Sequence, residues 1–252
     1  IIVGSDEVWN YNDSKSVSPV KFGEGLTCKN LISYAPSAGN SSIENLPDFA
    51  KKGIKRYNSI SVRDYTTENL VFQVTGKHPQ IVLDPTLLAN WEVNVDSPVK
   101  KKDYILFYYC EHLPVHIKTQ IFDYAHKNGL AVYGAGDSDK DYDECTVNLT
   151  PEEWVAMFKN ARFVFTGTFH GVIFSILNHR QFKVYLTNKG RIAKVGNLLS
   201  YFSIKDREID NHYIFDLEKQ RSEIDYASID RIIDKQRLES LNYLRDSIQS
   251  TK

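Results

Sequence analysis

The chain has 252 residues, 42% of them hydrophobic and 25% charged, which is typical of a globular protein with one large or two modest domains. Its 31 Lys and Arg residues nearly cancel its 32 Asp and Glu residues, so no overall positive charge favours a nucleic-acid partner. No run approaches the roughly 20 apolar residues of a transmembrane helix. The 3 cysteines lack the spacing of a zinc site or a disulfide framework, so we predict no metal site and expect buried thiols.

The first part of the chain alternates short apolar runs with helical stretches, which is typical of an α/β fold. The predicted strands cover residues 1–4, 31–35, 59–62 and 80–83, and the predicted helices cover residues 43–56 and 66–75. The first strand begins without a polar lead-in or a cap. We therefore expect a buried strand in a domain that is incomplete at its start.

The alternation resumes after a polar, proline-containing stretch around residue 97. The predicted strands cover residues 103–110, 130–133, 162–165 and 183–186, and the predicted helices cover residues 114–128, 151–160 and 169–178. Thr150 and Glu153 form a capping-box pattern at the start of one of these helices. From Tyr226 the chain is amphipathic, with an apolar stripe at Ile229, Ile232, Ile233, Leu238, Leu241, Leu244 and Ile248.

These patterns predict two successive α/β domains, 1–97 and 98–225, followed by a helix over 226–252 that packs back on them. Sheets of this kind bind ligands at the carboxyl ends of their strands. The motifs that follow predicted strands are therefore the candidates for a functional site.

The strongest motif is the sequence RFVFTGTFHG over residues 162–171, which predicts a strand, a tight turn and a helix. Thr166 and Thr168 can cap the new helix, and Gly167 permits the turn. The N-terminus of a helix presents unpaired N–H groups and is a natural site for a phosphate or a carboxylate. His170 lies in that first turn, either as a packing residue or, as its place at the sheet edge favours, as a functional one.

Further polar motifs follow the strands of the first part. In GSDEVWN, over residues 4–10, Gly4 and Ser5 allow close approach of a ligand, whereas Asp6 is either a functional carboxylate or the cap of a turn. Small residues fill the segment 33–39. Arg63 follows another strand, as an anion clamp or as half of an ion pair with Asp64 or Asp84.

Taken in order, five blocks resemble the polysaccharide pyruvyl transferase family over most of the chain, up to about residue 199. They are GSDEVWN, SYAPSAG, SVRD, VLDPTLL and TGTFHGVIFSILN, at residues 4–10, 33–39, 61–64, 82–88 and 166–178. The chain departs from the family at Gly167, where many relatives have Asp, and at Thr168, where others have Ser or Arg. Lys194 stands where relatives often carry Arg.

The resemblance implies two Rossmann-like domains in a GT-B-like arrangement, with the active site in the cleft between them. It implies transfer of pyruvate from phosphoenolpyruvate to a sugar of a capsule, an exopolysaccharide or a lipid-linked precursor, without a further cofactor. It places the protein in the cytoplasm or at the inner face of the membrane. His170 and Asp6 are the expected catalytic residues, and the expected substrate-binding residues are Gly4, Ser5, Trp9, Ser37, Arg63, Thr166, Thr168 and Gly171.

The expected reaction needs a proton donor, a base and positive groups for the donor's carboxylate and phosphate. His170 is the candidate acid or phosphate ligand, and Asp6 the candidate base or sugar anchor. Two other functions stay open because fold does not fix function: a glycosyltransferase that uses a nucleotide sugar, and a catalytically silent carbohydrate-binding relative.

Overall fold

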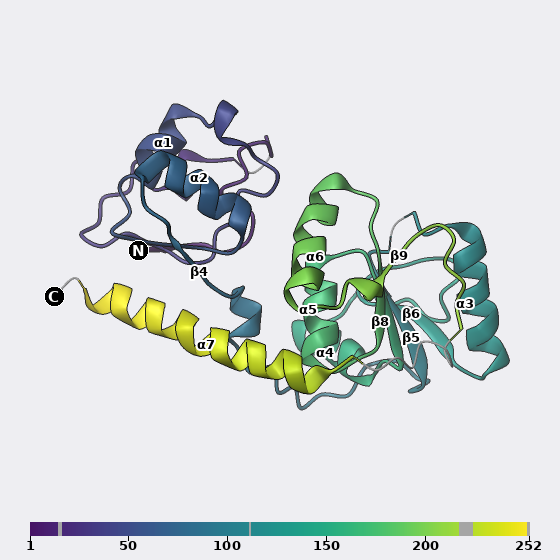
Figure 1. Cartoon of the computed structure of the whole chain (residues 1–252). Coiled ribbons are helices and arrows are strands. Elements are labelled where there is room, and N and C mark those ends of the chain that lie inside the picture. The colour runs from purple at the N-terminus through teal and green to yellow at the C-terminus, as the bar shows by residue number, and fades with distance from the viewer. Residues whose placement is uncertain (15–16, 111, 217–223, 251–252) are drawn as a thin grey trace. The chain divides into compact units, whose positions relative to one another are not determined.

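The computed structural model describes residues 1–14, 17–110, 112–216 and 224–250 (Figure 1). The chain divides into two compact units. The first comprises Ile1–Asn90 and the chain from Asp230 onward, and the second comprises Trp91–Ile229. The division thus falls before the polar stretch around residue 97, and most of the C-terminal helix belongs to the first unit.

The first unit contains a parallel sheet in the order β1-β2-β3-β4. Its strands are β1 (Ile2–Val3), β2 (Ile32–Ser33), β3 (Ser59–Val62) and β4 (Gln80–Ile81). Its helices are α1 (Asp48–Ile54) and α2 (Tyr65–Thr75), with short 3-10 turns η1 (Pro19–Phe22), η2 (Ile43–Asn45) and η3 (Pro85–Leu87). The helix predicted over 43–56 is divided because Pro47 is extended and cannot continue it.

Two expectations drawn from the sequence are wrong in detail. The strand at the start of the chain is not buried: Ile1 is 54% exposed and Ile2 49% exposed, because β1 lies at the edge of the described sheet. The thiols of Cys28 and Cys145 are exposed as well. Both cysteines lie in loops outside the strands and helices of the structure.

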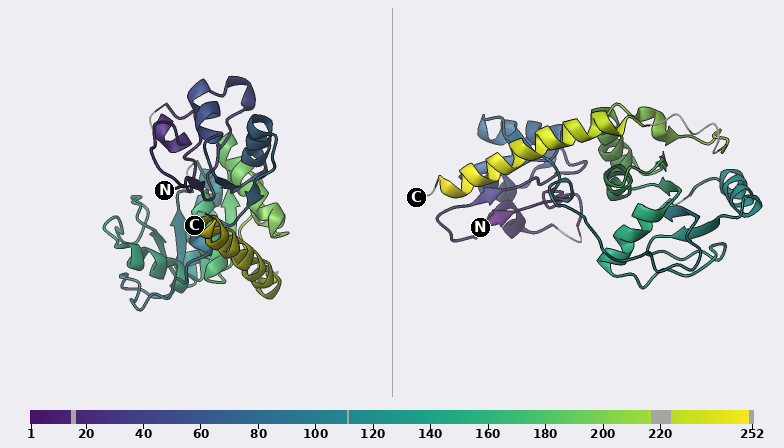
Figure 2. Two further views of the ribbon diagram at one scale, coloured as in Figure 1. Left: turned by 90° about the vertical axis from the view of Figure 1, so that its left-hand side faces the viewer. Right: turned by 90° about the horizontal axis from the view of Figure 1, so that it is seen from below.

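Helix α7 (Tyr226–Gln249) packs against this sheet through a face that is not purely apolar. The hydroxyl of Tyr243 donates to the Ser33 carbonyl at 2.9 Å, and Ser240 Oγ accepts from the Leu83 backbone N–H at 3.0 Å. Figures 1 and 2 show α7 on the side of the sheet away from α1 and α2. The predicted stripe is therefore wrong for Leu238, Leu241 and Ile248, which are exposed.

The second unit contains a parallel sheet in the order β6-β5-β7-β8-β9. Its strands are β5 (Tyr104–Tyr108), β6 (Ala131–Gly134), β7 (Phe163–Thr166), β8 (Phe182–Tyr185) and β9 (Glu208–Ile209). Its helices are α3 (Val115–Lys127), α4 (Pro151–Asn160), α5 (Phe169–Leu177) and α6 (Lys189–Tyr201), with the 3-10 turn η4 (Lys205–Arg207). The capping box of α4 is confirmed; α6, η4 and β9 were not predicted.

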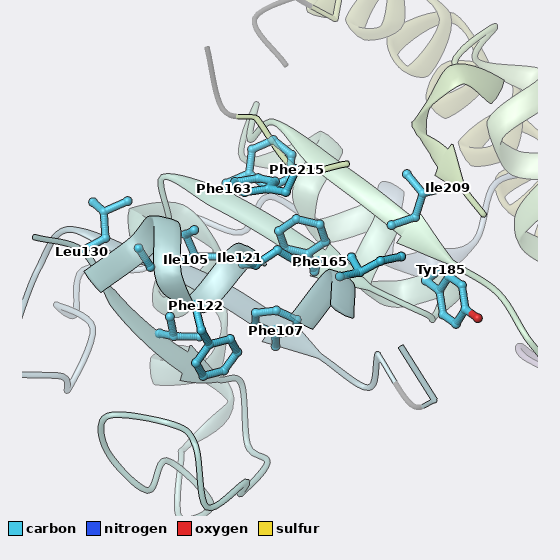
Figure 3. Close-up of a cluster of buried hydrophobic side chains, with 13 residues drawn as sticks. Ile105, Phe107, Ile121, Phe122, Leu130, Phe163, Phe165, Tyr185, Ile209 and Phe215 are labelled. Carbon is cyan, nitrogen blue, oxygen red and sulfur yellow. The ribbon is translucent and has the colours of Figure 1, made fainter. Parts of the chain in front are cut away.

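Both faces of the second sheet are buried, which explains its continuous apolar strands. Figure 3 shows one layer of this core, where Phe107 of β5 and Phe165 of β7 lie near Ile121 and Phe122 of α3. The rings of Phe107 and Phe165 stack at a centroid distance of 5.2 Å. Helices α4, α5 and α6 lie on the side of the sheet away from α3 (Figure 1). The strand ends are thereby held by close packing on two sides.

We predict that Ser240→Ala destabilises the protein by about 1–3 kcal/mol, because it leaves the buried N–H of Leu83 without its acceptor. Ser200→Ala is the matched control. Both serines donate to the carbonyl four residues earlier in their helix, but Ser200 is exposed. The control should change the free energy of unfolding by less than about 0.5 kcal/mol. Urea denaturation measures both, and equal small effects would show that the Leu83 bond does not hold α7.

Candidate functional site

The second sheet has a switch point between β5 and β7. The chain runs from β5 to β6 on one side and then crosses to β7 on the other side of β5. Open parallel α/β sheets bind ligands at such a point, outside the carboxyl ends of the strands. Here those ends are Tyr108 of β5 and Thr166 of β7, which lie side by side in the register of the sheet.

The turn after β7 is built by two threonines with different tasks. Thr166 Oγ1 donates to the Tyr108 carbonyl at 2.9 Å and accepts from the Thr168 N–H at 3.2 Å. Thr168 Oγ1 accepts from the Gly171 N–H at 3.0 Å and caps α5. The predicted cap is confirmed for Thr168, whereas Thr166 holds the turn to the neighbouring strand.

Two glycines of this turn occupy places where a side chain does not fit. A Cβ on Gly171 would lie 2.0 Å from Thr166 Oγ1. A Cβ on Gly167 would lie 2.6 Å from the Tyr109 carbonyl oxygen and 3.0 Å from that of Tyr185. Glycine at position 167 thus has a steric reason in this chain.

His170 is the second residue of α5, so it lies at the N-terminus of the helix and at the switch point. Its side chain is half-buried, as is that of Phe169. The two rings are nearly perpendicular, with centroids 5.5 Å apart. Lys194 Nζ lies 4.7 Å from the centroid of the Phe169 ring. The structure thus places His170 beside the ring of Phe169, which in turn lies under the ammonium group of Lys194 from α6.

Helix α6 was missed by the sequence analysis, although it begins at the same edge of the sheet. Asn188 Oδ1 caps it by accepting from the Gly190 N–H at 2.9 Å. Arg191, in its first turn, acts electrostatically on Tyr108: burial raises the pKa of Tyr108, the charge of Arg191 opposing the rise. A cap at Asn188 followed by apolar residues at Val195 and Leu199 was the signal for this helix. Two helix N-termini and two basic side chains therefore favour an anion here.

A second polar cluster lies at the carboxyl edge of the first sheet. Arg63 follows β3, and its Nη2 lies 3.0 Å from Asp6 Oδ1, after β1. Its Nη1 contacts Asp84 Oδ2, after β4. The side chains of Arg63 and Asp84 are 5% and 3% exposed, whereas that of Asp6 is 57% exposed. Of the pairs that the sequence left open, Arg63–Asp84 is present, and Asp64 instead caps α2 through the Thr67 N–H at 2.8 Å.

Burial and charge oppose each other in this cluster. Burial disfavours the ionised forms of Asp84 and Arg63, but their mutual attraction outweighs it. The pKa of Asp84 is therefore lowered by the charge of Arg63 and by hydrogen bonds from Thr86, and the pKa of Arg63 is raised by Asp84 and Asp6. Both groups are charged at neutral pH.

The loop after β1 approaches the loop after β2 closely. A Cβ on Gly4, whose φ is +136°, would lie 1.9 Å from the Tyr34 carbonyl oxygen. The Ser37 N–H donates to the Asp6 carbonyl at 2.7 Å, and the Ser37 carbonyl accepts from the Trp9 N–H at 3.1 Å. Glycine at position 4 is thus required by backbone packing.

The residues predicted to contact substrate differ in their burial. Trp9 is fully buried, and its Nε1 donates to the Lys21 carbonyl at 2.8 Å. Ser37, Thr166 and Gly171 are buried as well. These residues build the loops instead of facing solvent. Ser5, Thr168 and His170 are half-buried, and Gly4 and Asp6 are exposed, so they remain candidates for substrate contact.

Residues 1–186 match the model of the polysaccharide pyruvyl transferase family. The chain belongs to this family. A search of curated proteins found no match. A solved structure described as the glycotransferase of kitacinnamycin is similar with a TM-score of 0.39 and 11% identity, over 88% of this chain and 54% of that one. The chain thus spans about half the length of that structure, and the GT-B-like arrangement stays an expectation.

As a pyruvyl transferase family member, the protein has the four motif loops of the first sheet and the His170 turn inside the matched region. Arg191 and Lys194 lie beyond it.

Within the described residues, no group of three or more His, Cys, Asp or Glu side chains is arranged to hold a metal ion. No helix of the described ranges is long and apolar enough to cross a membrane.

We predict that Gly171→Ala destabilises the protein by about 1–3 kcal/mol, because the added methyl group overlaps Thr166. Gly196→Ala, in α6, is the matched control: nothing lies within 4 Å of its added Cβ. That change should be neutral or stabilise the helix by up to about 1 kcal/mol. Guanidinium denaturation distinguishes the two, and a Gly171 variant as stable as the wild type would refute the steric argument.

We predict that Asp84→Asn lowers the free energy of unfolding at pH 7 by about 3–5 kcal/mol, because it leaves Arg63 buried with one partner fewer. A carboxylate with a lowered pKa stabilises the fold above its unfolded pKa of about 3.9, and this contribution is lost as pH falls through its folded pKa. The difference between variant and wild type should therefore shrink towards pH 2. Asp64→Asn should cost less than about 0.5 kcal/mol, because the side-chain oxygen of asparagine still caps α2. Urea titrations at both pH values test this, and a difference independent of pH would contradict it.

Proposed function

We propose that this protein transfers the pyruvyl group of phosphoenolpyruvate to a sugar of a surface polysaccharide or its lipid-linked precursor, forming a pyruvate ketal. One observation carries the proposal. In a member of the pyruvyl transferase family, His170 lies at the switch point of the second sheet and at the N-terminus of α5. An acid–base side chain and an anion-binding helix end are thus combined at the edge where such sheets bind ligands.

The donor carries a carboxylate and a phosphate, and the second unit offers matching positive groups. The N-termini of α5 and α6 each contribute a partial positive charge, and Arg191 and Lys194 contribute full charges. The planar fork of Arg191 suits a bidentate contact with an oxyanion, whereas Lys194 acts as a point charge. These groups support binding of the donor in the second unit.

The chemistry then follows from proton transfers. His170 donates a proton to the methylene carbon, and the resulting methyl-bearing cation is stabilised by its enol oxygen. A sugar hydroxyl attacks the cationic carbon that bears the enol oxygen and the carboxylate, and it loses its proton. Phosphate leaves with the bonding electrons, and a second hydroxyl attacks the same carbon to close the ketal. Of the two hydroxyl protons, one restores the acid and the other leaves with the phosphate.

The first unit supplies the candidate for the acceptor side. Asp6 is an exposed carboxylate at the carboxyl edge of the first sheet, which suits a sugar hydroxyl. We propose action at the cytoplasmic side of the membrane or on its inner face, during synthesis of a capsule or an exopolysaccharide, because phosphoenolpyruvate is a metabolite of the cytoplasm.

We predict that His170→Asn folds normally and loses about a hundredfold or more in turnover, because an amide cannot act as an acid. Phosphate release from phosphoenolpyruvate is measured with oligosaccharides prepared by removing pyruvate from the organism's own surface polysaccharide. His126→Asn is the control: it is exposed on α3, with Nε2 3.5 Å from Asp143. It should leave turnover unchanged.

Three other results would contradict the proposal. Full activity of a folded His170→Asn variant would make His170 a packing residue. Sugar transfer from a nucleotide sugar, without phosphate release from phosphoenolpyruvate, would indicate a glycosyltransferase. Carbohydrate binding without either reaction would indicate a silent relative.

A further inference from the structure

The two terminal guanidinium nitrogens of Arg63 both contact carboxylates of the protein. Its Nη1 contacts the buried Asp84, and its Nη2 contacts the exposed Asp6. Asp84 is held in turn by the Thr86 N–H at 3.0 Å and by Thr86 Oγ1 at 2.7 Å. The three charged side chains thus form a row that starts in the interior and ends at the solvent-exposed edge of the first sheet.

The backbone fixes the end of this row. Asp6 has a φ of +60°, in the left-handed region, which aspartate tolerates better than most side chains. Its carbonyl accepts from the Ser37 N–H at 2.7 Å, and the Arg63 N–H donates to the Pro36 carbonyl at 3.2 Å. Asp6 and Arg63 are therefore both tied to the loop after β2. Their separation is set by the fold and not only by the attraction between them.

The neighbouring acidic groups have other tasks. Glu7 Oε2 accepts from Asn10 Nδ2 at 2.9 Å, and Asp64 caps α2. Asp84 also faces Arg63, but it is almost completely buried and bonded to Thr86. The guanidinium of Arg63 lies between the two carboxylates, so its charge acts on Asp6 from the buried side, while the 57% exposed side chain of Asp6 faces solvent.

We infer that Asp84 and Arg63 are positioning residues that keep the Asp6 carboxylate ionised and fixed, so that Asp6 accepts a hydrogen bond from the acceptor sugar and does not take up its proton. This inference rests on the proposed function for the reaction in which Asp6 takes part. A carboxylate whose ionised form is stabilised is a weak base, and a proton acceptor works best when its pKa lies near the working pH. The base for the sugar hydroxyl is then another group.

The ionisation of Asp6 is tested without any assay of activity. The carboxyl carbons of aspartate are followed by 13C NMR between pH 2 and 7 in the wild-type protein, and the Asp6 signal is identified by its loss in Asp6→Asn. We expect a midpoint below the ordinary value of about 3.9. The double variant Arg63→Gln with Asp84→Asn removes the cation without leaving a buried unpaired carboxylate. It should raise the Asp6 midpoint by about one pH unit or more.

Asp64→Asn is the matched control, because Asp64 and Asp84 each accept from the N–H and the hydroxyl of a threonine, yet only Asp84 contacts Arg63. It should leave the Asp6 midpoint unchanged. An ordinary midpoint in the wild type, or no rise in the folded double variant, would overturn the inference. The NMR titration of Asp6 does not depend on whether the protein releases phosphate from phosphoenolpyruvate. A negative result of the titration is therefore distinct from failure of the proposed function.

The role of Asp6 is tested by kinetics with the depyruvylated oligosaccharides. Asn retains a carbonyl oxygen that accepts a hydrogen bond, so Asp6→Asn should raise the KM for the oligosaccharide and lower kcat by less than tenfold. The acidic limb of kcat/KM for the oligosaccharide should move to higher pH by about one unit in the Arg63/Asp84 double variant, and not in Asp64→Asn. A loss of a hundredfold or more in kcat for Asp6→Asn at unchanged KM would make Asp6 the general base and overturn the inference.

Discussion

The first unit depends on one buried guanidinium. Removing a charge from water is costly unless the partners compensate it, and Arg63 is compensated by Asp84 on one side and Asp6 on the other. Because the three residues follow β3, β4 and β1, this contact joins the ends of strands that are only two to four residues long. Such short strands share few ladder hydrogen bonds, so the loops at the carboxyl edge need side-chain contacts of their own. The same contacts determine where the exposed carboxylate of Asp6 lies.

In the second unit, the loops that follow the strands are fixed by close packing of apolar side chains. Its strands are apolar on both faces, and stacked aromatic side chains between the sheet and α3 fix the strand ends (Figure 3). The turn after β7 fits against β5 only because Gly167 and Gly171 have no side chains. The position of His170 is thus fixed by strand β7, by the close-packed turn that follows it and by the capped N-terminus of α5. A loop of ordinary flexibility would not hold an acid–base group in this way.

The carboxyl edges of the two sheets differ in chemical character. The edge of the second sheet gathers helix N-termini and the basic residues Arg191 and Lys194, which favours an anion. The edge of the first sheet ends in a carboxylate whose neighbours are already paired, which favours a hydroxyl group. Under the proposed function, the first character suits phosphoenolpyruvate, which is an anion, and the second suits the acceptor sugar, which is a polyol. Glycine at position 167 fits the packing of this chain, because a side chain there would meet the carbonyl oxygens of Tyr109 and Tyr185.

The alternation of apolar runs determined the α/β class and most strands of both sheets, because strand burial and helix periodicity are local properties of a sequence. The Thr150–Glu153 capping box and the cap at Thr168 were predictable for the same reason: each joins residues three apart. The ordered motifs also led to the family and to His170. Helix α6 was overlooked, although its Asn188 cap was visible in the sequence.

Contacts between residues far apart in the chain were decided only by the tertiary structure. Sequence alone could not choose between Asp64 and Asp84 as the partner of Arg63, because either carboxylate could neutralise the guanidinium charge. Asp84 is within reach of Arg63 because β3 and β4 are neighbours in the sheet. It likewise could not show that the ring of Trp9 is buried, and it expected an apolar stripe on α7, where Ser240 and Tyr243 bond to Leu83 and Ser33. A hydrophobic pattern in a sequence predicts which side chains are removed from water. It does not record which buried polar group finds a partner across the fold.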